Sequence, residues 1–239
     1  MKIGIIGAMK IEIDNLIEDL KEKEVATFAG RNYFSGIINN ISVVIVESGI
    51  GMVNAAVATQ IMIDKFAPDY IINTGIAGSL DTNVHIKDVV VATDAVQHSF
   101  DVSKYGYPLG QIPNKNVFSF ESDKYLLEII SGLNLENISI HHGRIVSGDK
   151  FISDDIHKTF LKNTFNALCA EMEGASIAHV CFDNNIPFII IRSISDNADD
   201  NASISYDEFE KIAADTSKTL TLKLIDSLSS SKNRVEGRY

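Results

Sequence analysis

The chain has 239 residues, 45% of them hydrophobic, and a formal net charge of −11 at pH 7. These totals allow one large α/β domain, or two small ones, with a sizeable core. They argue against a nucleic-acid partner, because phosphate binding needs clustered lysines and arginines and the sequence has only five arginines.

Strands are predicted where short apolar or β-branched runs are bounded by glycine, proline or asparagine. In chain order these runs are residues 2–7, 32–38, 41–48, 70–73, 88–96, 138–147, the start of 167–180, and 187–196. The turn Asn39-Asn40 is expected to join the second and third strands into a hairpin. We expect the glycine-rich segment 74–79, TGIAGS, to be a loop that offers backbone N–H groups to an anion or a polar ligand.

Helices are predicted where apolar residues recur at helical spacing. These segments are residues 10–21, 52–66, 121–132, 153–164 (capped by Ser153 or Asp154), the later part of 167–180, and 206–228. Residues 98–120 lack periodicity but contain several aromatics, which is typical of a functional loop or of one packed against a partner. Strands and helices alternate throughout, so one α/β domain is expected over 1–228. The polar residues 229–239 form a C-terminal tail, either native or foreign to the natural chain.

Two cysteines, Cys169 and Cys181, lie in apolar surroundings without metal-ligand spacing. They indicate buried free thiols of a reducing compartment. The apolar stretch at the N-terminus is too short for a signal peptide, and no later run approaches the about 18 apolar residues of a transmembrane helix. We therefore expect a cytoplasmic protein that neither enters a membrane nor holds a metal.

Acidic residues follow several predicted strands, at the edge where open α/β sheets bind ligands. Asp196 ends the last strand, Glu12 begins the first helix, and Glu171 and Glu173 stand between the strand and the helix of 167–180. Each has a local alternative: Asp196 would only form an Asx turn, and Glu12 would only complement the helix dipole. Without a metal cluster, a catalytic triad or a P-loop, carboxylates suit glycosyl chemistry, in which one acid protonates the leaving group and another activates water.

Six short runs add a more specific signal. In chain order they are IGIIGAM with Glu12, SGIG, INTGIAG, VSGDxFI, AEMEGASIAHV and IRSISD-x-AD. Together they resemble the 5′-methylthioadenosine/S-adenosylhomocysteine nucleosidases, a family of the purine nucleoside phosphorylase and uridine phosphorylase superfamily. The resemblance extends in order from residue 1 to about 228. It implies a single-domain, three-layer α/β/α fold with a central, mixed, twisted β-sheet.

The resemblance implies hydrolysis of the N-glycosidic bond of methylthioadenosine and adenosylhomocysteine, and also of 5′-deoxyadenosine, without a cofactor. Adenine and a 5-thioribose would be released. Asp196 would protonate N7 of adenine, Glu12 would activate the water, and Glu173 would bind the 2′- and 3′-hydroxyls. The other implied pocket residues stack on or pair with the base, pack on the sugar, support the acid and the water, or line the pocket: Met9, Ile50, Ile76, Phe151, Ile152, Met172, Arg192, Ser195 and Tyr206.

Members of that family are homodimers. By resemblance, Val102, Tyr105 and Pro113 of the neighbouring chain would cover the alkylthio end of the substrate. Four positions depart from the family pattern: relatives often have Ser where this chain has Ile76, Asp where it has Ser99, and Phe where it has Tyr105 and Tyr206. These departures bear on the preference for the 5′-substituent.

Three alternatives share the fold. A nucleoside phosphorylase would need cations for phosphate, but the first loop places Glu12 beside Lys10, and that carboxylate would repel phosphate. A 6-amino-futalosine hydrolase would use the same residues as the nucleosidase. A relative that only binds or stores nucleosides would not need Glu12, Glu173 and Asp196 together.

Overall fold

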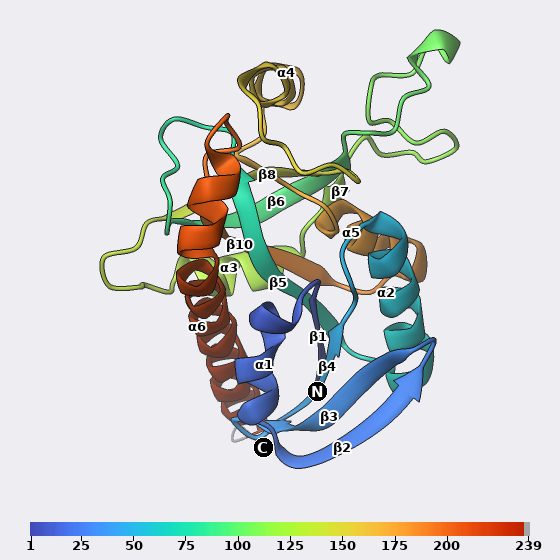
Figure 1. The fold of residues 1–239 in the computed structure, drawn as a ribbon. Helices are drawn as coiled ribbons and strands as arrows, with labels where there is room; N and C mark the ends of the chain where they lie inside the picture. Colours follow the sequence, from blue (N-terminus) through green and yellow to red (C-terminus); the bar gives the residue numbers. More distant parts are fainter. Residues whose placement is uncertain (237–239) are drawn as a thin grey trace.

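The structure is a computed structural model that describes residues 1–236, a mixed α/β protein built on a central sheet (Figure 1). The strands described are β1 (Lys2–Gly7), β2 (Lys21–Phe28), β3 (Arg31–Ile38), β4 (Ile41–Glu47), β5 (Tyr70–Ser79), β6 (Val89–Gln97), β7 (Phe120–Glu121), β8 (Ile140–Ser147), β9 (Cys169–Glu171) and β10 (Phe188–Asp196). The helices are α1 (Lys10–Glu18), α2 (Met52–Phe66), α3 (Lys124–Ser131), α4 (Asp155–Phe165), α5 (Gly174–Asn184) and α6 (Ala202–Glu236), with a short 3₁₀ turn, η1 (Ser103–Tyr105).

The sheet has a parallel centre, in which β4, β1, β5 and β10 lie side by side. Antiparallel β3 and β2 extend it at one edge. On the other side β10 pairs with β6, β6 with β8, β8 with β9, and β9 turns back onto β5. These five strands therefore close on themselves, and the carboxyl ends of β1, β5 and β10 meet the end of β9 at one rim.

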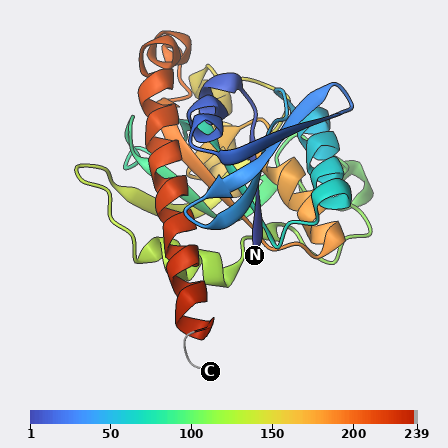
Figure 2. The same ribbon diagram turned by 90° about the horizontal axis from the view of Figure 1, so that it is seen from below.

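Helices cover both faces of the sheet, which confirms the mixed α/β architecture with a central mixed sheet (Figures 1 and 2). On one face α1, α3 and α6 pack through Ile13, Leu16, Leu126, Leu220 and Leu224, all buried. On the other face α2 and α5 pack through Ala55, Ala58, Met62, Ile177 and Ala178. Over residues 1–236, none of the helices combines enough length with enough apolar character to cross a lipid bilayer.

Several predicted boundaries are confirmed. The strand 2–7 and the helix 52–66 begin and end as expected. Asn39 and Asn40 have φ angles of 48° and 63°, the left-handed values that a two-residue hairpin turn requires. Asp154 is the cap of α4, because its Oδ1 accepts a 2.8 Å hydrogen bond from the backbone N–H of His157.

The sequence interpretation was wrong at three places. Strand β2 was missed because most of its side chains are exposed and its KEKEVATF sequence has no apolar alternation. Residues 74–79 are not a loop, since β5 continues to Ser79. The last helix is longer than the predicted 206–228: its backbone is helical from Ala202 to Glu236, so 229–236 continue it, and residues 237–239 of the predicted tail lie outside the described residues.

Candidate active site

A cavity of about 450 Å³ opens at the rim where β1, β5, β9 and β10 end. It collects side chains that are far apart in the sequence: Glu12 from the start of α1, Glu173 from the β9–α5 connection, and Asp196 from the end of β10. The other predicted residues on its wall are Met9, Ile50, Ile76, Phe151, Met172, Ser195 and Tyr206. The remaining lining residues were not among the implied pocket residues: Ala8, Ala77, Gly78, Ala170, Glu171, Ser203 and Asp207.

Glu12 is a buried carboxylate held by three backbone N–H groups. Its Oε2 accepts from Ala8 at 2.6 Å and Met9 at 3.0 Å, and its Oε1 accepts from Ile76 at 3.1 Å. Burial raises the pKa of Glu12, while the charge of Arg192 and the three N–H groups act in the opposite direction. The bond to Met9 also completes the first turn of α1, so the local helix role and the cavity position coexist.

Asp196 is 1% exposed and sits at the carboxyl end of β10. Its Oδ1 accepts from the N–H of Ala198 at 2.8 Å, and its Oδ2 accepts from the hydroxyl of Ser195 at 2.8 Å. The first of these bonds is the Asx turn that the sequence left open as an alternative. Burial raises the pKa of Asp196, which favours a protonated carboxyl facing the cavity.

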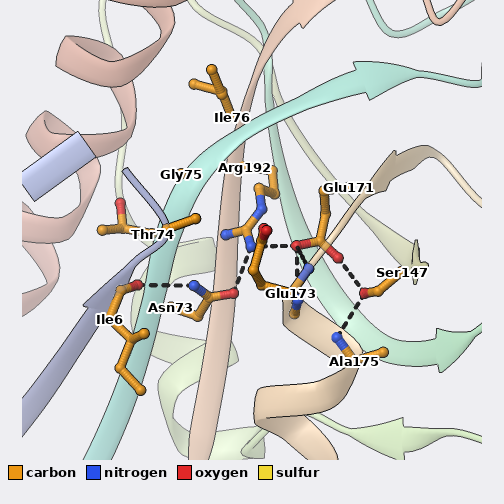
Figure 3. Close-up of polar contacts among 12 residues, drawn as sticks. Ile6, Asn73, Thr74, Gly75, Ile76, Ser147, Glu171, Glu173, Ala175 and Arg192 are labelled. Carbon is orange, nitrogen blue, oxygen red and sulfur yellow. Dashed lines mark hydrogen bonds and ion pairs between the residues drawn. The ribbon is translucent and has the colours of Figure 1, made fainter. Parts of the chain in front are cut away.

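Arg192 does not line the cavity; it is 2% exposed and lies within the network of polar contacts shown in Figure 3. Its Nη2 donates to Asn73 Oδ1 at 2.6 Å and to Glu171. Glu171 also accepts from Ser147 and from the backbone of Glu173 and Gly174. The guanidinium is therefore locked by a fully paired carboxylate, and this network orients the β9–α5 connection.

Glu173 makes fewer hydrogen bonds through its side chain than the neighbouring Glu171 does, among the described contacts. One hydrogen bond anchors it, from the N–H of Gly51 to Oε1 at 2.8 Å. Burial and the nearby charge of Glu171 raise the pKa of Glu173 to about 8, although Arg192 opposes the shift. Glu171 and Glu173 share a cavity wall, but only Glu171 is committed to a buried ion pair.

Two glycines of β5 make room for the carboxylates. A Cβ at Gly75 would lie 2.5 Å from Glu12 Oε1, and a Cβ at Gly78 would lie 2.6 Å from Asp196 Oδ1. Any side chain at these positions would displace the acids. The glycines of TGIAGS therefore serve close approach of carboxylates, not the loop geometry that we predicted.

Apolar side chains close the outer part of the cavity. Phe151 and Tyr206 meet edge to face, with ring centroids 5.8 Å apart, and the Tyr206 hydroxyl donates to Met9 Sδ at 3.3 Å. Burial raises the pKa of Tyr206, so the phenol stays neutral. Ile152, also predicted, lines a small recess beside Asp196 that adjoins the cavity. A flat apolar ligand would fit between these walls.

The three residues predicted to serve a neighbouring chain lie elsewhere. Val102, Tyr105 and Pro113 belong to the segment between β6 and β7, which projects from the body of the protein around η1 (Figure 1). None of them lines the cavity of its own chain, and Tyr105 is 83% exposed.

The predicted thiols are also located. Cys169 and Cys181 are free and buried in the core, and burial raises the pKa of both. Neither lines the cavity, so thiolate chemistry has no place in this site.

The sequence interpretation missed the groups that support the acids. Asn73 binds Arg192 and Ser147 binds Glu171, and neither was given a role, although each lies in one of the quoted runs, INTGIAG and VSGDxFI. The two side chains are 1% and 0% exposed, and buried polar side chains must find partners.

Comparison with known proteins gives a consistent result. Residues 2–226 match the family model described as the phosphorylase superfamily. A curated relative from Exiguobacterium sp., a 5′-methylthioadenosine/S-adenosylhomocysteine nucleosidase, is 40% identical over 225 residues, which cover 93% of this chain and 96% of the relative.

Two solved structures are similar over nearly their whole length. The 5′-methylthioadenosine/S-adenosylhomocysteine nucleosidase of Neisseria meningitidis, in complex with methylthio-immucillin-A, has a TM-score of 0.92 and 38% identity over 95% of this chain and 99% of its own. The futalosine hydrolase of Helicobacter pylori has a TM-score of 0.90 and 36% identity over 95% and 97%.

Proposed function

The chain belongs to the phosphorylase superfamily and, within it, to the 5′-methylthioadenosine/S-adenosylhomocysteine nucleosidases, and from this premise we propose how its site works. It is an N-glycosyl hydrolase that releases adenine from methylthioadenosine and adenosylhomocysteine. The observation that carries the mechanism is the convergence of Glu12, Glu173 and Asp196 on one cavity.

Asp196 acts as the general acid. Adenine leaves poorly as an anion, so a proton delivered to N7 lowers the barrier, and a placed general acid is worth roughly 10²–10⁴-fold. Burial favours the protonated form of Asp196, and the Ser195 hydroxyl and the Ala198 N–H fix its two oxygens. The fixed carboxyl therefore presents its proton in one direction.

Glu12 acts on the water. Its carboxylate is ionised during attack, and the raised pKa that burial gives it makes it a stronger base than an exposed glutamate. Three N–H groups hold both of its oxygens in place. As the sugar becomes cationic, the ionised Glu12 stabilises its charge, while Glu173 binds the 2′- and 3′-hydroxyls.

Hydrolysis is favoured over phosphorolysis by the charges around the cavity. Among the described residues that line it, five are acidic (Glu12, Glu171, Glu173, Asp196 and Asp207) and none is lysine or arginine. Arg192 lies beneath the wall, paired with Glu171. A phosphate dianion would meet repulsion here, whereas neutral water would not.

The test is adenine release from each nucleoside, followed with and without phosphate. We expect equal rates in both buffers; absolute phosphate dependence would contradict hydrolysis. Because a structural neighbour is a futalosine hydrolase, the assay includes 6-amino-futalosine as a third substrate. A kcat/KM at least about tenfold higher for that substrate than for both adenine thio-nucleosides would reassign the specificity.

The assembly and setting are part of the proposal. The enzyme works as a homodimer in the cytoplasm, within methionine salvage, and Val102, Tyr105 and Pro113 of one chain cover the alkylthio end of the substrate bound by its partner. Support comes from the projecting segment that carries these residues and from the 83% exposure of Tyr105 (Figure 1). Analytical ultracentrifugation of the purified protein tests this, because a homodimer should sediment with twice the mass of one chain.

A further inference from the structure

The loop between β4 and α2, residues 48–51, lies between two hollows of the protein. On one side Ile50 lines the active-site cavity. On the other side Ser48 and Gly49 line a second hollow of about 670 Å³, which contains no predicted site residue. Ser48 is 1% exposed and its N–H donates to the carbonyl of Gly7 at 2.8 Å, so the core holds the start of the loop, whereas Ile50 is 52% exposed and lacks that support.

The position of this loop matters to the site. Gly51 donates its N–H to Glu173 Oε1 at 2.8 Å, the one hydrogen bond that anchors that carboxylate in the described chain. Gly49 and Gly51 have φ angles of 81° and 98°, a region that L side chains rarely adopt. Such a backbone is intrinsically free, so something else must hold it where Glu173 needs it.

Arg31, at the start of β3, grips the loop from the second hollow. Its Nε donates to the carbonyl of Ser48 at 2.7 Å, and its Nη2 donates to Asn54 Oδ1 at 2.6 Å. Its Nη1 donates to the carbonyl of Ala29 at 3.0 Å, which ties the guanidinium to its own turn. Three N–H edges thus point to three acceptors, a geometry that lysine cannot reproduce.

Asn54, in the first turn of α2, connects this arginine to the cavity wall. While its Oδ1 accepts from Arg31, its Nδ2 donates to the carbonyl of Ile50 at 2.7 Å. A continuous path therefore runs from Arg31 through Asn54 to Ile50, and through the adjacent N–H of Gly51 to Glu173. Both side chains are partly buried and both are occupied by these bonds.

We propose that Arg31 and Asn54 form a clamp that positions the 48–51 loop, and through it Ile50 and Glu173, for binding of the sugar of the substrate. The inference rests on the proposed function of Glu173. Arg31 and Asn54 are then positioning residues, since neither lines the active-site cavity. The second hollow is the side from which these two residues reach the loop.

The test compares Arg31→Lys and Asn54→Asp with the wild type. Arg31→Lys keeps the positive charge but cannot donate to all three acceptors, Ser48, Asn54 and Ala29. Asn54→Asp keeps the oxygen that accepts from Arg31 and loses the N–H that donates to Ile50. We expect KM to rise about tenfold in each variant, the size of one lost hydrogen bond involving a charged group, with kcat within about threefold of wild type. A merely structural role would instead lower the melting temperature and kcat and leave KM unchanged.

Asn32→Ala is the matched control, because Asn32 follows Arg31 in β3, is exposed, and its side chain bonds only to Thr27 among the described contacts. It should behave as wild type. In a Glu173→Gln background, Arg31→Lys should raise KM less than about twofold further, since the clamp acts through Glu173. Unchanged KM in both variants, or fully additive losses, would overturn the clamp. An inactive wild type would overturn the proposed function itself, and with it the purpose of the clamp.

Discussion

Replacing Gly75 by alanine should disable Glu12 and leave the sheet intact. The added Cβ would lie 2.5 Å from Glu12 Oε1, 3.1 Å from Glu12 Cδ and 3.3 Å from Arg192 Nη1. Ordinary contacts of this kind begin near 3.4 Å. The arginine is locked by its own partners, so the carboxylate must retreat by about 1 Å, and its bond to the N–H of Ile76 is lost.

A displacement of this size is costly for catalysis. Moving a catalytic group by about 1 Å typically lowers the rate about 10²-fold, and we expect that loss in kcat/KM for methylthioadenosine. Gly75 has no left-handed φ angle, so alanine is compatible with the strand and the melting temperature should change little. Adenine release and thermal unfolding, measured on the same preparation, separate the two effects.

Gly132→Ala is the control, because the nearest atom to its added Cβ is an ordinary 3.5 Å away and the site is remote. If Gly75→Ala kept kcat/KM within about threefold of wild type, with normal folding, the fixed placement of Glu12 would not be the basis of its action.

Three further predictions follow from the buried charges. Asp196→Asn and Glu12→Gln should each retain less than about a tenth of the wild-type kcat with an unchanged melting temperature, and greater residual turnover would contradict the assigned roles. Burial and the charge of Glu171 raise the pKa of Glu173 from the ordinary 4.5 to about 8, so the folded state binds a proton more tightly; stability should fall as pH rises from about 4.5 to about 8, and urea unfolding of Glu173→Gln should lack that fall. Arg192→Met should lower the free energy of unfolding by about 3–5 kcal/mol by stranding Glu171, and Glu171→Leu in the same chain should restore much of it.

The sequence predicted the layered fold because its signals are local. Residues 3–7 are uniformly apolar, and Met52–Phe66 is a long segment rich in apolar residues that ends before a proline. Strand β2 carries no such signal, since its partner β3 supplies its hydrogen bonds while most of its own side chains are exposed. This strand forms because it pairs with β3, and the composition of a single strand does not reveal its pairing partner.

The site, like the fold, was predictable from the sequence only in part. The acids at strand ends were visible, and the structure brings Glu12, Glu173 and Asp196 to one cavity. The role of Gly75 and Gly78 was not visible, because a glycine that clears space for a side chain 63 or 118 positions away looks the same as a glycine in a turn. Only the position of distant residues in the fold, and not the residue type, distinguishes these two kinds of glycine.

The same reasoning explains why an arginine lies under a site that repels phosphate. Burial raises the pKa of all three carboxyl groups that face the cavity, those of Glu12, Glu173 and Asp196. Arg192 lowers the pKa of Glu12 and of Glu173 from below the wall, where it cannot contact an anionic ligand directly. Asp196, for which Arg192 is not among the causes of the pKa shift, keeps the tendency to hold its proton. One buried cation therefore distinguishes the base from the acid, because its charge acts on the pKa of Glu12 and is not among the causes of the shift at Asp196, and Glu171 keeps the cation in that place.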